Sequence, residues 1–167
     1  MRAALALTLM AAPAFAASPD LQTPSPVIHL ADNLDEADRL GWCIDTVGRG
    51  FGEQIHAHSC KPRGGDVQFS YSAEKTEIRS VAFPDYCMAV QAGGARTFGL
   101  VACDETAPEQ RFTYDALHGA ITPTQTPSTC VVVGTASRSA GPFLSRDLLL
   151  ADCDASPPER RTWVVVP

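Results

Sequence analysis

Four polar side chains in the N-terminal half of the chain stand at spacings that suit ligand binding or acid–base chemistry. They are Asp45 in GWCIDT, His56 and His58 in QIHAHSC, and Asp66 in RGGDVQF. Successive side chains of a β-strand point to opposite faces, so His56 and His58 are expected on the same side of a strand. Two imidazoles with a carboxylate can hold a divalent ion, and two carboxylates can carry out glycoside hydrolysis.

Simpler interpretations of these residues also remain open. Asp45 can bond to nearby backbone N–H groups where its strand ends, and the two histidines can lie on an exposed polar face. The spacing fixes no third metal ligand, and the sequence has none of the C-x2-C pairs that are typical of zinc sites. We therefore predict no metal and no cofactor.

The N-terminus has the pattern of a secretory signal peptide. Arg2 precedes an apolar run over residues 3–12, and Ala14-Phe15-Ala16 supplies a small-x-small cleavage motif. The run is shorter than the roughly 20 apolar residues that a membrane span needs. We predict a signal peptide at residues 1–16, cleavage after Ala16, a linker at residues 17–26, and a secreted or periplasmic protein with no membrane span.

Length and charge set further bounds. A chain of 167 residues suits one domain with a real core. Its net charge is −6, so it lacks the basic surface that nucleic acids or anionic membranes require, and we expect no nucleic-acid partner.

The six cysteines repeat at a fixed period. Cys43 to Cys87 is 44 residues, Cys87 to Cys130 is 43, and Cys60 to Cys103 is again 43. A period in this range indicates stacked or radially repeated units. We infer three units, at about residues 27–71, 72–114 and 115–167. The third is longer between its cysteines, with an insertion at residues 137–146 that we expect to form a loop.

Each unit reads as short β-strands separated by turns. Runs such as YCMAV and TCVVV hold β-branched or aromatic residues, turn residues bound them, and no helical period follows the signal. The pattern predicts an all-β, three-lobed barrel whose core includes the aromatic residues Trp42, Phe69, Phe112 and Trp163. In an oxidising compartment the economical disulfide pairing lies within units, as Cys43–Cys60, Cys87–Cys103 and Cys130–Cys153. Each bridge contributes roughly 3 kcal/mol by the chain-entropy estimate.

These features together resemble the ricin B-type β-trefoil lectins over about residues 27–167. The resemblance rests on the threefold spacing with paired cysteines, on Cys-x-Asp at Cys43, and on a Gln-x-aromatic signature whose Gln persists only in Gln110-Arg111-Phe112. It implies twelve strands, six closing a barrel and six capping it. The third unit ends soon after its aromatic strand, so we expect the segment at residues 27–30 to help close the barrel.

The resemblance also implies a sugar site in each unit that keeps certain side chains. In the first unit Asp45 stands at the carboxylate place, His58 at the aromatic place, His56 at the polar place and Asp66 at the Asn place. The corresponding residues of the other units lack the acid and the flat ring; they are Ala89, Val101, Gly99 and Glu109, then Val132, Ala151, Leu149 and Arg160. We expect at most one sugar site, in the first unit.

Two functional hypotheses follow. The first is an exported lectin, not an enzyme, that binds a glycan or polysaccharide, with Trp42 or Phe51 as a candidate apolar wall beside His58. Catalytic motifs such as G-x-S-x-G and H-E-x-x-H do not occur in the sequence. The second is a β-trefoil scaffold that no longer binds sugar and contacts a protein partner, as an inhibitor or envelope component, through the insertion at residues 137–146.

Overall fold

The computed structural model describes residues 17–34, 36–48, 50–91 and 98–167. The signal peptide predicted for residues 1–16 lies outside this part of the chain. The described residues form twelve strands and two short 3-10 helices, η1 (Pro108–Gln110) and η2 (Pro158–Arg160). The strands are β1 (Val27–Leu30), β2 (Trp42–Thr46), β3 (Gln54–Ser59), β4 (Phe69–Ser72), β5 (Glu77–Ser80), β6 (Tyr86–Val90), β7 (Phe98–Ala102), β8 (Phe112–Asp115), β9 (Ala120–Pro123), β10 (Thr129–Ala140), β11 (Phe143–Asp152) and β12 (Trp163–Val166).

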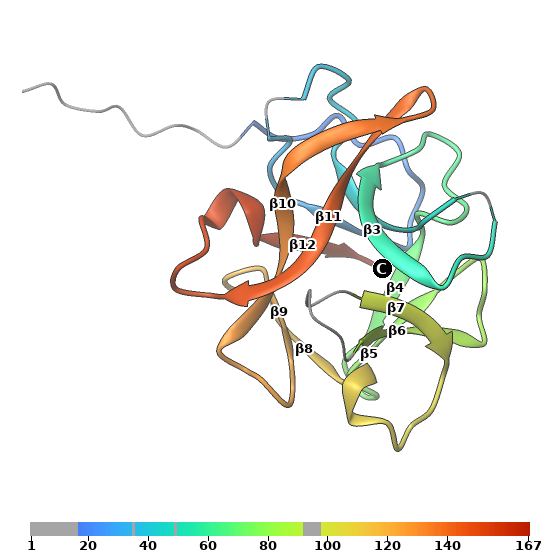
Figure 1. Ribbon diagram of the computed structural model, residues 1–167, viewed down its shortest axis with the longest axis vertical. Helices are drawn as coiled ribbons and strands as arrows, with labels where there is room; N and C mark the ends of the chain where they lie inside the picture. The colour runs from blue at the N-terminus through green and yellow to red at the C-terminus, as the bar shows by residue number, and fades with distance from the viewer. Residues whose placement is uncertain (1–16, 35, 49, 92–97) are drawn as a thin grey trace, which may run out of the picture.

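The strands form one large antiparallel sheet and a separate hairpin. The main path runs β12-β1-β2-β3-β7-β6-β5-β4, with β11 added to β3 and β10 added to β11, while β8 and β9 pair with each other. Figure 1 shows these hairpins arranged around the barrel in three lobes. The all-β architecture expected from the short apolar runs is therefore confirmed.

The two ends of the domain meet in the barrel wall. Strand β1 pairs with β12 along its whole length, from Val27 opposite Val166 to Leu30 opposite Trp163. The expectation that residues 27–30 close the barrel is confirmed, and the reason is the ring of three units, which brings the first strand next to the last.

Aromatic side chains at equivalent places fill the core. Trp42, Phe69, Phe112 and Trp163 are each at most 1% exposed, as the sequence predicted. Both indole N–H groups find backbone acceptors, Trp42 on the carbonyl of Asn33 and Trp163 on that of Val131. Buried Trp is well suited to such a core because it adds a large apolar area while its single donor is satisfied.

Each unit carries one disulfide within it. The bridges are Cys43–Cys60, Cys87–Cys103 and Cys130–Cys153, with Cα atoms 5.1, 5.0 and 5.0 Å apart. This is the pairing that the repeat predicted. The Cys43–Cys60 bridge packs with Val27 and Val67 in a small apolar cluster of its own, so it fixes the start of β2 against the end of β3.

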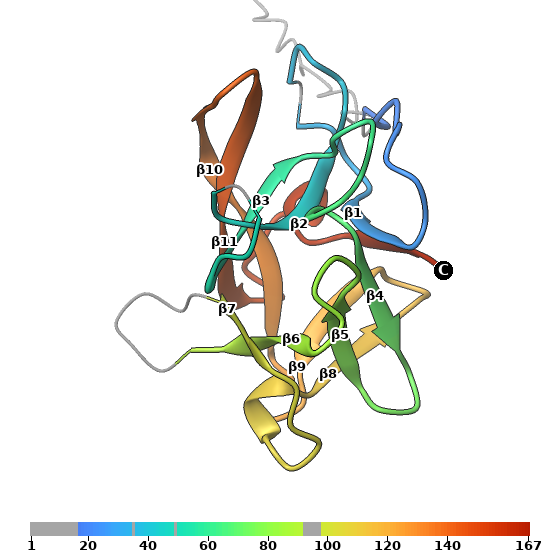
Figure 2. The same cartoon turned by 90° about the vertical axis from the view of Figure 1, so that its right-hand side faces the viewer.

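The insertion of the third unit departs from expectation. We expected a loop at residues 137–146, but the segment continues β10 and β11 as a hairpin, with only Gly141 and Pro142 between the strands. Gly141 has a φ of +68°, a conformation that costs little without a side chain. The edge of β11 pairs with β3, Ser145 opposite His58, which satisfies backbone groups that a loop would leave to water. Figure 2 shows this hairpin beside β3, projecting past the barrel.

Candidate functional site

The hairpin of β2 and β3 brings three of the predicted site residues to one face. Asp45 lies opposite His56, and Cys43 lies opposite His58, so these side chains point away from the core side of the sheet. The two imidazole rings are 5.4 Å apart between centroids. The expectation that both histidines share one face of a strand is confirmed.

Lys61, which the sequence reasoning missed, joins these residues to Asp66. Its ammonium donates to Asp66 Oδ1 at 2.7 Å and lies 3.1 Å from Asp45 Oδ2. The imidazoles are slightly farther from the same oxygen, with His56 Nε2 at 3.8 Å and His58 Nδ1 at 3.7 Å. We call Asp45, His56, His58, Lys61 and Asp66 the polar cluster. The sequence could have indicated that Lys61 lies near Asp45. Lys61 directly follows Cys60, and the disulfide partner of Cys60, Cys43, lies two residues before Asp45.

The polar cluster is largely buried. Asp45 is 1% exposed, and His56 and His58 are 8% and 6% exposed, so the interpretation of the histidines as an exposed polar face is wrong. Within the described part of the chain, neither carboxylate oxygen of Asp45 accepts a hydrogen bond, which contradicts its role as a backbone-capping acid. The Lys61 ammonium lies 3.1 Å from Oδ2 and forms an ion pair with this buried charge. Burying a carboxylate without hydrogen bonds is costly, and a hydroxylated ligand can supply them.

Charge states in the polar cluster follow from burial and neighbours. Burial lowers the pKa of His58, and the bond from the ring to the carbonyl of Ser59 opposes this only in part. Because a carbonyl oxygen only accepts, the 2.8 Å bond assigns the proton of the neutral ring to Nδ1. Burial also acts to lower the pKa of Lys61, but Asp66 and Asp45 outweigh it and raise that pKa. The site therefore offers a cation, neighbouring carboxylates and a neutral imidazole.

The aromatic ring beside the polar cluster comes from another unit. Phe143, the first residue of β11, lies 5.7 Å from the His58 ring between centroids, at 64°. Trp42, one of the two residues considered as a wall, is buried in the core, and Phe51 packs against Phe83 and Tyr86 of the second unit. The sequence did not reveal Phe143 because the pairing of β11 with β3 joins units that are distant in the chain.

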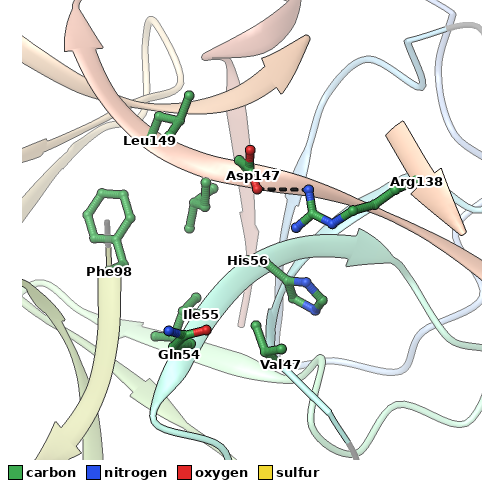
Figure 3. A pocket seen from close by; sticks show the side chains of 9 residues that line it. Val47, Gln54, Ile55, His56, Phe98, Arg138, Asp147 and Leu149 are labelled. Carbon is green, nitrogen blue, oxygen red and sulfur yellow. Dashed lines mark hydrogen bonds and ion pairs between the residues drawn. The ribbon is translucent and has the colours of Figure 1, made fainter. Parts of the chain in front are cut away.

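A cavity of about 240 Å³ adjoins the polar cluster. His56 contributes to both, whereas Asp45, His58 and Asp66 do not line the cavity. Other polar lining comes from Gln54, Arg138 and Asp147, and apolar lining from residues that include Val47 and Phe98 (Figure 3). This cavity, too, depends on the hairpin of the third unit.

The equivalent hairpins of the other units have the same register and different chemistry. Ala89 lies opposite Gly99, and Val132 lies opposite Leu149, where the first unit has Asp45 and His56. In the described ranges no group of three His, Cys, Asp or Glu side chains has the arrangement of a metal site. Likewise, none of the helices in the described residues is both long and apolar enough to cross a membrane.

Comparisons with solved structures place the fold among lectin-like β-trefoils. A chain of the cytolethal distending toxin from Actinobacillus actinomycetemcomitans matches with a TM-score of 0.59 and 17% identity, over 86% of this chain and 92% of that chain. The β-trefoil lectin of the Vibrio vulnificus hemolysin/cytolysin, solved with N-acetyl-D-lactosamine bound, matches with a TM-score of 0.56 and 14% identity, over 83% and 90%. GalNAc-T7 matches with a TM-score of 0.56 and 17% identity over 89% of this chain, but the match spans only 23% of GalNAc-T7.

At these identities the likeness shows the fold, a β-trefoil, and not the ligand. A search of curated proteins gave no match. The family model for the ricin-type beta-trefoil lectin domain matches residues 34–163, a range that contains all three disulfides. Membership of this family supports carbohydrate binding. The chain belongs to the ricin-type β-trefoil lectin domain family.

Proposed function

We propose that this protein is an exported lectin without catalytic activity, which binds one sugar at the polar cluster of its first unit. The proposal rests mainly on Asp45, because this carboxylate is buried and its two oxygens accept no hydrogen bond within the described chain. Vicinal sugar hydroxyls can both donate to one carboxylate, which makes this acid a suitable partner for a saccharide.

Lys61 controls access to Asp45 in this proposal. Its side chain is 21% exposed and its ammonium lies between Asp45 and Asp66. A lysine has a long flexible stem, so the ammonium can move toward Asp66 and keep one ion pair. That movement opens Asp45 Oδ2 to two sugar hydroxyls, while the ammonium donates to a ring or hydroxyl oxygen of the same sugar.

The remaining members of the polar cluster complete the contact. The neutral His58 ring carries its proton on Nδ1, so Nε2 is unprotonated and its lone pair can accept a hydrogen bond from a sugar hydroxyl. Phe143 adds an aromatic ring beside His58, which itself stands at the position where the resemblance implies a stacking ring. Export is supported by the N-terminal sequence pattern and by three disulfides, which form in oxidising compartments.

A glycan array followed by calorimetric titration tests the proposal. The mature protein is expected to bind at least one glycan, and Asp45→Asn is expected to abolish that binding while the circular dichroism spectrum stays unchanged. Glu109→Ala is the matched control, because Glu109 occupies in the second unit the place that Asp66 has in the first. Absence of binding to every glycan, or undiminished binding by a folded Asp45→Asn variant, overturns the proposal.

A second candidate function is contact with a protein partner through hairpin β10–β11. Residues 135–139 of the hairpin are exposed, and beyond the pairing with β3 its tip projects past the barrel. A pull-down that captures a partner, and loses it when residues 137–146 are replaced by a short turn, supports this function. Capture that survives the replacement rules out the hairpin as the contact.

A further inference from the structure

The cavity beside the polar cluster draws residues from all three units. Gln54 and His56 come from β3 in the first unit, Phe98 from β7 in the second, and Arg138 and Asp147 from the hairpin of the third (Figure 3). We propose that this cavity is a second subsite, which binds a neutral pyranose ring linked to the sugar held by the polar cluster. The proposal rests on the proposed function, because the two subsites share His56.

Size limits what the cavity can hold. Its volume of about 240 Å³ is below the range of roughly 300–1,000 Å³ that is typical of pockets for drug-sized ligands. One sugar ring suits such a space, and a longer oligosaccharide does not. The cavity therefore fits the second residue of a disaccharide whose first residue lies at the polar cluster.

The charges at the cavity favour a neutral sugar. Arg138 Nη1 donates to Asp147 Oδ1 at 2.8 Å, and both side chains are about half exposed, at 49% and 63%. The pair neutralises itself, so the cavity offers no net positive charge to an acidic sugar. The guanidinium keeps further N–H donors and the carboxylate keeps a second acceptor oxygen, which together match adjacent hydroxyls that each donate and accept.

His56 links the cavity to the polar cluster. His56 is only 8% exposed. Its Nε2 atom has no hydrogen-bond partner in the described ranges and lies 3.8 Å from Asp45 Oδ2. A buried polar atom without a partner costs free energy, and a ligand hydroxyl at this point removes that cost. Because the same imidazole contributes to both sites, one glycosidic bond can connect the two rings.

Apolar side chains supply the remaining wall. Val47 is 41% exposed and lines the cavity together with Ile55 and Phe98. A pyranose presents C–H groups on one face and hydroxyls at its edge, so it requires an apolar wall next to polar groups. The cavity provides this combination, with Arg138 and Asp147 on the hairpin and Val47 beside β3 (Figure 3).

Calorimetric titrations with N-acetyl-D-lactosamine and with galactose, its terminal ring, test the subsite on the full mature chain. The wild type is expected to bind the disaccharide about tenfold more tightly than the monosaccharide, as for one added hydrogen bond to a charged group. Asp147→Ala and Arg138→Ala are expected to lower disaccharide affinity to that of galactose and to leave galactose binding unchanged. Glu105→Ala is the matched control, because Glu105 forms a similarly exposed ion pair with Lys75 in the second unit.

The outcomes separate the two proposals. Disaccharide affinity that is unchanged in both Asp147→Ala and Arg138→Ala, but lost in Asp45→Asn, overturns the subsite and leaves the proposed function standing. Galactose binding that survives Asp45→Asn but falls in Asp147→Ala overturns the polar cluster as the primary site. If neither sugar binds to the wild type and the glycan array also has no binder, both proposals are overturned.

Discussion

The first and second units share a frame, by which we mean the paired Cys strands and their disulfide, and differ in the side chains that the frame carries. Both have a disulfide that closes a similar loop, with sequence separations of 17 and 16, and both pair their Cys strands in the same register. On the outer face, however, Asp45 opposite His56 in the first unit corresponds to Ala89 opposite Gly99 in the second. The frame therefore does not require polar residues at these positions, which identifies the polar cluster of the first unit as an addition to the fold.

The two units also differ in how their buried carboxylates are held. Glu77 in the second unit is 2% exposed and accepts from Arg79 Nε at 3.0 Å, with Arg79 Nη2 at 2.7 Å. Asp45 has only an ammonium at 3.1 Å and two more distant imidazoles. Both Arg79 nitrogens reach the same oxygen, Oε1, while Oε2 accepts no hydrogen bond within the described chain and has Arg111 Nη1 at 3.7 Å. The planar guanidinium thus holds one oxygen of Glu77 in place, whereas a flexible lysine can move away from Asp45. We therefore infer a structural role for Glu77, and this difference is consistent with the proposal that Asp45 binds a ligand.

Removing disulfides produces the largest expected effect and tests whether frame and site separate. The double variants Cys43→Ala/Cys60→Ala and Cys87→Ala/Cys103→Ala are each expected to lower the free energy of unfolding by about 3 kcal/mol, because the loops are nearly equal. Only the first is expected to lose glycan binding, since that bridge positions Asp45 and Lys61. Urea unfolding and calorimetric titration measure the two effects, and equal loss of binding in both variants contradicts the distinction.

The two buried acids give the next largest difference. Glu77→Gln is expected to lower the free energy of unfolding by about 2 kcal/mol, because it removes a buried charge-assisted bond and leaves Arg79 and Arg111 without their anion. Asp45→Asn is expected to cost less than this, since Asp45 accepts no hydrogen bond within the described chain. Urea unfolding of both variants checks the order. A larger loss for Asp45→Asn means that Asp45 is primarily structural.

Most of the frame was predictable because it repeats. Equal spacing of Cys and aromatic residues fixes three units, and the disulfides and core follow from it, as Trp42 and Trp163 show. Closure by β1 was also predictable, because a ring of units leaves only one place for the first strand.

The candidate site was only partly predictable, because it depends on contacts between units. Asp45, His56, His58 and Asp66 were named from their places in one unit, and the structure brings them together. Lys61 and Phe143 were missed. Lys61 has no special spacing beyond its place after Cys60, and Phe143 reaches the cluster only because a segment expected as a loop pairs with β3. A repeat pattern describes each unit separately and carries no information on such added strands.

Substitution of Asp66 and of Glu109, which occupy equivalent places in the first and second units, tests the same difference with a smaller expected effect. Asp66→Ala is expected to weaken glycan binding about tenfold, or about 1.4 kcal/mol. Without Asp66, the ammonium of Lys61 has only Asp45 as a partner and competes with the sugar for it. The same change at Glu109 is expected to have no effect. Calorimetric titration measures both, and equal affinities of the two variants show that Lys61 does not control access.

The smallest expected effect is an acid sensitivity confined to the first unit. Burial lowers the pKa of both His29 and His58, so the folded state favours their neutral forms. Their contribution to stability is complete above the unfolded pKa of about 6.5 and is lost as the pH falls toward the folded values. Each histidine can account for at most about 1.4 kcal/mol per pH unit.

Amide hydrogen exchange can locate this loss within the molecule. Between pH 6.5 and 5 protection is expected to fall in β1 to β3 and to hold in β6 and β7, because His29 and His58, the two histidines whose pKa burial lowers, lie in β1 and β3 of the first unit. The exposed acids of the second unit do not interfere, since hydrogen bonds to Thr106 and Lys75 lower the pKa values of Asp104 and Glu105 below their already acidic usual values. His58→Gln is expected to reduce the loss in β2 and β3. If acid weakens all three units together, the polar cluster is too strongly coupled to the core to open separately, and the movement of Lys61 proposed for sugar entry loses its basis.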